Sequence, residues 1–119
     1  MSEKAAVLDT LTNEFLSVRQ EIADALTLEA IQLREARDFR TEHDRLRTER
    51  EHLEAGDESP PQVAAGRSDF QKRCAALLKR ELLHREKCRA LAEKMRILKS
   101  RLLSVLARFD LLLEPVMAA

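Results

Sequence analysis

The chain has 119 residues, of which 35% are charged and 3% aromatic, with two glycines and no tryptophan or tyrosine. This composition is typical of long helices or coiled coils, and it argues against a β-sheet fold and a large globular core. The net charge is zero, yet residues 1–58 carry eight Lys/Arg against fifteen Asp/Glu, whereas residues 67–113 carry thirteen against five. Halves of opposite charge favour either pairing with each other or binding of charged partners.

The sequence contains no recognisable signal for export or for membrane insertion. The start, MSEKAAVLDT, lacks the basic-then-apolar order of a signal peptide, and the most apolar stretch, residues 102–116, is interrupted by charged residues and Pro115. Cys74 and Cys88 lie fourteen residues apart on one predicted helix. That spacing corresponds to about 21 Å of helical rise, so the two thiols cannot bond to each other. We therefore expect a reducing location, in the cytosol or the nucleus, and of these we favour the cytoplasm.

Helix-breaking residues divide the chain into two predicted helices within one unit. No Gly or Pro precedes Gly56, which is followed by Pro60 and Pro61, and these residues end or exclude a helix. Ser68 and Gln71 then have the spacing of a capping box, which predicts the start of the second helix. The predicted elements are a helix over 3–55, a turn over 56–67, a helix over 68–113 and a short tail over 114–119.

Both predicted helices keep a heptad repeat, written abcdefg, whose a and d positions form the seam of a coiled coil. In the first helix, a is Leu8, Phe15, Ile22, Glu29, Ala36, His43 and Arg50, and d is Leu11, Val18, Ala25, Gln32, Phe39, Leu46 and Leu53. In the second, a is Cys74, Glu81, Cys88, Met95, Leu102 and Phe109, and d is Phe70, Leu77, His84, Leu91, Leu98, Val105 and Leu112. The repeat predicts an all-α antiparallel coiled-coil hairpin, completed into a larger bundle by a partner or a second copy.

Toward the turn, the predicted seam becomes polar. Polar core residues of coiled coils specify register at a cost in stability, and we expect that role here. A metal site is a weaker hypothesis, because CxxC and HExxH spacings are missing. This part of the predicted seam contains Glu29, Gln32, Ala36, His43, Glu81, His84 and Cys88.

The g positions of the two helices carry opposite charges, and g faces g in an antiparallel pair. The predicted ion pairs are Glu14–Arg108, Glu21–Arg101, Glu35–Lys87, Glu42–Arg80 and Glu49–Arg73, interrupted by Leu28–Lys94. Each exposed pair is worth about 0.2–1 kcal/mol, so the row selects the pairing direction more than it stabilises. The first helix alone also suits a parallel homodimer, but the second has no acidic e position to match its basic row. The hairpin satisfies both helices.

Leucines also occupy positions b and e, outside the predicted seam. In an antiparallel hairpin the two e rows lie on the same side, so these residues form an apolar flank. Such a flank predicts an interface, either with other helical proteins or with a second copy. The leucine flank consists of Leu16, Leu26, Leu33, Leu78, Leu82, Leu103, Leu106 and Leu113.

These patterns favour a protein that works by binding. The chain has no Gly-rich phosphate loop and no nucleophile with a base at fixed spacing, so we expect no enzyme, cofactor, metal or small-molecule substrate. Nucleic-acid binding is a less favoured alternative, because the basic row already faces an acidic row and aromatic residues for base stacking are few. The prediction is a coiled-coil scaffold or linker subunit of a cytoskeletal, axonemal or tethering assembly.

A transport role is the main alternative function. Two long antiparallel helices resemble the central stalk proteins of flagellar and type III export ATPases. This resemblance lies in the architecture and in no specific motif. It implies a stalk or chaperone hairpin that serves a transport machine.

Overall fold

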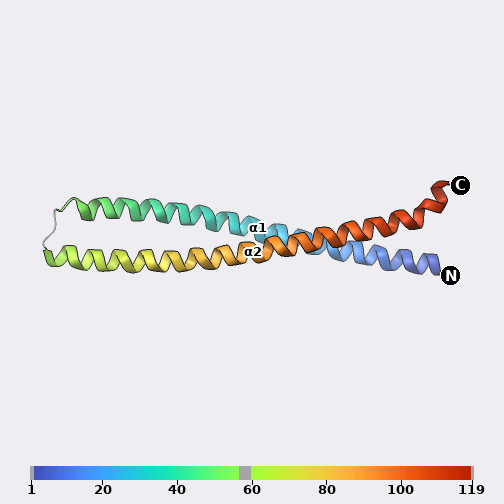
Figure 1. Cartoon of the computed structure of the whole chain (residues 1–119), viewed down its shortest axis with the longest axis horizontal. Coiled ribbons are helices and arrows are strands. Elements are labelled where there is room, and N and C mark those ends of the chain that lie inside the picture. The colour runs from blue at the N-terminus through green and yellow to red at the C-terminus, as the bar shows by residue number, and fades with distance from the viewer. Residues whose placement is uncertain (1, 57–59, 119) are drawn as a thin grey trace. The chain divides into compact units, whose positions relative to one another are not determined.

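A computed structural model describes residues 2–56 and 60–118, with side chains as far as residue 113. Helix α1 spans Glu3–Glu54 and helix α2 spans Pro60–Ala118, and no strand occurs within the described residues. Both helices are drawn in Figure 1. The predicted all-α fold with two long helices is confirmed.

The start of α2 differs from the prediction. The helix begins at Pro60, a residue well suited to the first helical position because its φ is fixed and its missing N–H would have no partner there. Ser68 therefore lies inside the helix, and the predicted capping box is wrong. Residues 60–67 of the predicted turn are helical, while residues 57–59 lie outside the described part of the chain.

Close packing against α1 accounts for these additional helical residues, which make about two turns. A Cβ atom built on Gly66 would lie only 2.9 Å from Cδ2 of Leu53, so the glycine lets the two helices approach each other. Val63, one heptad before Phe70, is half-buried. The seam thus extends one heptad toward the N-terminus, before the predicted start of α2.

The other helix ends follow two different patterns. Helix α1 ends at Glu54, close to the prediction, and Gly56 adopts a φ of 74°, the left-handed conformation that glycine commonly supplies after a helix. Helix α2 continues through Pro115 to Ala118. The prediction of a separate tail over 114–119 is therefore wrong for residues 114–118, and residue 119 lies outside the described residues.

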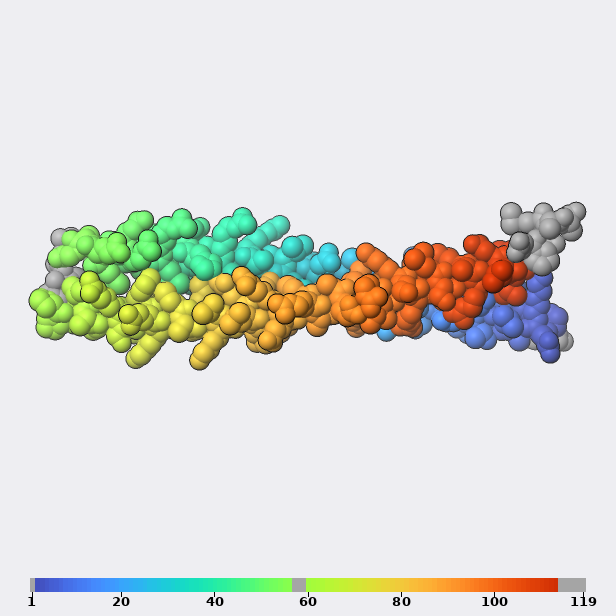
Figure 2. All heavy atoms as spheres, viewed as in Figure 1, coloured from blue at the N-terminus to red at the C-terminus, as the bar shows by residue number. Residues whose placement is uncertain are grey.

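The chain forms two compact units, each built from one segment of each helix. The terminal unit comprises Met1–Glu29 and Arg89–Ala119, and the central unit comprises Ala30–Cys88. In both units the two segments run antiparallel, because contacts pair rising residue numbers on α1 with falling numbers on α2. Figure 2 shows the side chains of the α1 and α2 segments lying against each other within the central unit.

The terminal unit contains the predicted apolar seam. Its buried side chains are all at d positions, and its a positions other than Glu29 are half-buried. Ala25, Leu91 and Leu98 form one buried cluster, against which Ile22 and Met95 pack. The buried d residues are Leu11, Val18, Ala25, Leu91, Leu98 and Val105.

The central unit departs from the predicted seam. Leu77 is its only buried hydrophobic residue among those described. On α1 the a residues Ala36, His43 and Arg50 are exposed, whereas the d and g residues are half-buried. His43 and Arg50 are better solvated than buried, so α1 presents its d and g positions to α2 instead. The prediction that Ala36 and His43 lie in the seam is wrong, as it is for Glu29, which is exposed in the terminal unit.

Candidate functional site

The charged flank of the terminal unit contains two of the predicted ion pairs. Arg108 donates from Nη2 to Oε1 of Glu14 over 2.8 Å, and Arg101 donates from Nη1 to Oε2 of Glu21 over 2.9 Å. All four side chains remain partly exposed, so each pair contributes at most about 0.2–1 kcal/mol. Both pairs lie in the g-to-g arrangement expected for antiparallel helices.

In the central unit, one predicted pair forms and another is replaced. Arg73 donates from Nη1 to Oε1 of Glu49, and this hydrogen bond raises the pKa of the Arg73 guanidinium. Glu35 binds His84 instead of Lys87, with 3.0 Å between Oε2 and Nδ1. The prediction of a Glu35–Lys87 pair is therefore wrong. The imidazole occupies a d position and reaches across the seam, with only 12% of its side chain exposed.

The predicted pair between Glu42 and Arg80 is not formed either. Glu42 accepts a hydrogen bond of 3.0 Å from Arg45 on its own helix. The Arg80 guanidinium lies 5.5 Å from the centre of the Phe39 ring, a cation–π arrangement. Glu42 thus pairs with Arg45 on its own helix, and Arg80 lies over Phe39. These contacts replace a cross-helix ion pair that would contribute little to stability.

Two histidines of the central unit, the exposed His43 and the half-buried His84, also make polar contacts. His43 of α1 pairs with Glu81 of α2. His84 meets the edge of the Phe39 ring, with centroids 5.2 Å apart, and its Nε2 lies 3.5 Å from Sγ of Cys88. Among the described residues, no group of three or more His, Cys, Asp or Glu side chains is arranged to hold a metal ion.

The leucine flank is exposed at every one of its positions. The exposed fractions range from 42% at Leu106 to 67% at Leu103. None of these side chains belongs to the buried cluster of the terminal unit. The structure therefore leaves the whole leucine flank accessible, at Leu16, Leu26, Leu33, Leu78, Leu82, Leu103, Leu106 and Leu113.

The c and g positions carry further exposed apolar residues that the sequence analysis missed. They include Val7 and Leu111, which line a hollow of about 450 Å³ in the terminal unit together with Thr10 and Leu112. The c-row spacing of Leu83, Ile97 and Leu111 was the available signal. The exposed apolar residues outside the leucine flank are Val7, Leu28, Ile31, Leu83, Ile97 and Leu111.

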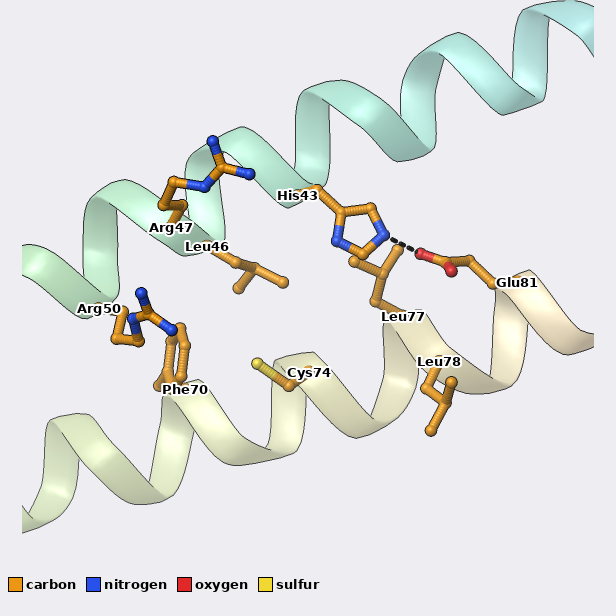
Figure 3. A pocket seen from close by; sticks show the side chains of 9 residues that line it. All are labelled: His43, Leu46, Arg47, Arg50, Phe70, Cys74, Leu77, Leu78 and Glu81. Carbon is orange, nitrogen blue, oxygen red and sulfur yellow. Dashed lines mark hydrogen bonds and ion pairs between the residues drawn. The ribbon is translucent and has the colours of Figure 1, made fainter.

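A groove on the e side of the central unit was also missed, because the predicted seam filled it with the a residues of α1. Two adjoining hollows, of about 280 Å³ and 320 Å³, share His43, Arg47 and Glu81. Figure 3 shows the first of them, with Leu46 of α1 and Leu77 of α2 pointing into the space between the helices. We call the two hollows together the arginine groove. Its arginines are Arg40, Arg47, Arg50 and Arg85.

Comparison of the chain with protein-family models, with curated proteins and with solved structures finds no match. Over the described residues, neither helix contains a stretch that is both long and apolar enough to cross a membrane. The functional interpretation therefore follows from the two exposed surfaces themselves, the leucine flank and the arginine groove.

Reversing the charges of Arg101 and Arg108 to Glu should destabilise the terminal unit by about 1–2 kcal/mol, because each new carboxylate would face an acidic g residue. Thermal denaturation followed by circular dichroism measures the loss, which should shrink at high salt. Adding Glu14→Arg and Glu21→Arg restores opposite charges and should recover most of the stability. A quadruple variant as unstable as the double variant would show that these rows do not pair in solution.

Proposed function

We propose that this protein is a non-enzymatic coiled-coil scaffold or linker subunit that binds other helical proteins through its leucine flank. The observation that carries the proposal is the exposure of all eight leucines of this flank. Scattered surface leucines are ordinary, but exposed leucines that recur at b and e positions of both helices give each unit its own apolar strip.

The small size of the buried core supports a binding role for this flank. Only seven hydrophobic side chains of the described residues are buried, so the helix pair has a small core of its own. Covering the flank would remove further apolar surface from water, at about 25 cal/mol for each Å². A further helix, or a second pair of helices, provides the matching shape, as in helical bundles.

The polar features of the chain also fit a binding role better than catalysis. Its charged clusters form cross-helix pairs that set direction and register, which is their usual part in coiled coils. The assembly we propose is cytoplasmic and of the cytoskeletal, axonemal or tethering kind. A stalk or chaperone hairpin of a transport machine is the second candidate, since it too would use two long paired helices.

The flank is tested by changing Leu103 and Leu106 together to Glu. Circular dichroism should show nearly unchanged helicity, because neither side chain is buried in the seam. Association should be lost, since the change would bury charges without counter-ions. Analytical ultracentrifugation measures self-association, and affinity purification with mass spectrometry measures capture of helical partners, or of a ring ATPase for the transport alternative.

A matched control changes Ser104 and Ala107 to Glu, which adds the same charge at exposed positions outside the flank of the same helix. This control should retain association. Association that survives in the Leu103/Leu106 variant, or a loss of helicity in it, would remove the basis of the proposal.

A further inference from the structure

The floor of the arginine groove is apolar. Leu46 of α1 and Phe70, Cys74 and Leu77 of α2 line the first hollow. In Figure 3, these four side chains lie between the two ribbons, while Leu78 lies on the outer side of α2. Leu78 belongs to the leucine flank and is 58% exposed, so the groove is continuous with that flank.

The rim of the groove is rich in arginine. Arg40, Arg47 and Arg85 are exposed, and none of them forms an ion pair with any described residue. Arg50 has a distant partner, Glu54, at 3.8 Å.

Two acidic side chains also line the groove, and neither neutralises this rim. Glu81 is already engaged by His43, and Asp44 forms no ion pair within the described residues. Asp44 alone cannot balance the arginines of the rim. Positive charge beside an apolar floor attracts and orients a ligand of opposite charge.

The groove lies between two helices, at the place where a third helix packs in a helical bundle. The a residues of α1 are exposed here, so the e side of the central unit lacks the apolar closure that the terminal unit has. A third helix placed over the groove would bury Leu46, Leu77 and Leu78 and would lie between the arginines of the rim. Helix-in-groove recognition uses this combination of an apolar face and charged edges.

We propose that the arginine groove binds an acidic amphipathic helix of a partner protein. The inference rests on the proposed function and names the partner chemistry of the central unit. An apolar floor distinguishes this ligand from a nucleic acid, because a phosphate backbone contacts arginines without needing Leu46 or Leu77. The leucines of the partner helix would cover the floor, and its carboxylates would pair with Arg40, Arg47 and Arg85.

The test uses the full chain and a labelled synthetic helix of about four heptads, with leucine at a and d and glutamate at e and g. A second helix with lysine at e and g serves as the comparison. Fluorescence anisotropy should show that the acidic helix binds at least about tenfold more tightly than the lysine helix. Binding should weaken as the salt concentration rises.

Changing Arg40, Arg47 and Arg85 together to Glu should weaken binding of the acidic helix by at least about tenfold and strengthen binding of the lysine helix. The matched control changes Arg34, Lys72 and Lys79 to Glu, at exposed f positions of the same unit. It alters the net charge equally and should leave binding of the acidic helix unchanged. A triple change to Gln repeats the test without new charges, and circular dichroism checks that every variant remains helical.

Any of the following results would overturn the inference. The acidic helix fails to bind, both triple Glu variants weaken binding equally, or duplex DNA of similar length binds more tightly than the acidic helix. The last result would identify a polyanion surface, as would an unchanged affinity in the Leu78→Ala variant. Loss of association in the Leu103/Leu106 variant is measured separately in the terminal unit, so failure of the groove and failure of the leucine flank are distinguishable.

Discussion

Replacement of Leu98 by Ala should lower the free energy of unfolding by about 2–5 kcal/mol, the range found for buried leucines that leave a cavity. Leu98 is only 2% exposed and lies in the cluster with Ala25 and Leu91. Few other buried side chains are available to compensate in so thin a core. Urea denaturation, followed by the helical signal in circular dichroism, would measure the loss.

The matched control for this change is Leu103→Ala. Leu103 lies five residues further along the same helix and is 67% exposed. Its truncation should change the free energy of unfolding of the isolated chain by no more than about 0.5 kcal/mol. Equal losses in the two variants would mean that the leucine flank is part of the core, and the proposed interface would then be untenable.

Replacement of Ala25 by Leu should destabilise the terminal unit by about 1–3 kcal/mol through overpacking. Ala25 is fully buried, with 0% of its surface exposed, and it faces a cluster that contains Leu91 and Leu98. A larger side chain at this site would have to displace one of these neighbours. The melting temperature, measured by circular dichroism, should fall accordingly.

Ala36→Leu is the informative counterpart. Ala36 occupies a predicted seam position, yet it is exposed in the central unit. The same enlargement should therefore be nearly neutral there, within about 0.5 kcal/mol. A marked change in stability at Ala36 would show that α1 presents its a positions to α2 in solution, and the arginine groove would then be filled by these residues.

Local patterns were sufficient to predict the helices and their direction of pairing. Gly56 marks the end of α1 closely, because a glycine after a helix acts through the backbone conformation of that residue. The apolar heptads of the terminal unit predicted its seam, since the same periodicity that places Leu98 and Val105 on one face also buries them together. The exposure of the leucine flank follows from the same periodicity.

The start of α2 shows where local patterns failed. Ser68 has the sequence of a good N-cap, but a cap contributes only about 0.5–2 kcal/mol. Starting the helix at Pro60 instead brings Gly66 into contact with Leu53. That contact joins residues of different helices, so no window of neighbouring residues could have revealed it.

The sequence by itself determined the two helices, the antiparallel charge pattern and the apolar rows, because each follows from residues three, four or seven positions apart on one helix. Tertiary structure decided which polar groups meet. Glu35 pairs with His84 and not with Lys87, and Arg80 lies over Phe39. These alternatives differ by small free energies, so the face that α1 presents to α2 selects among them. In the central unit this face consists of d and g positions, which leaves the a residues exposed and the arginine groove open. That choice of face depends on the fit between two helices and not on either helix alone.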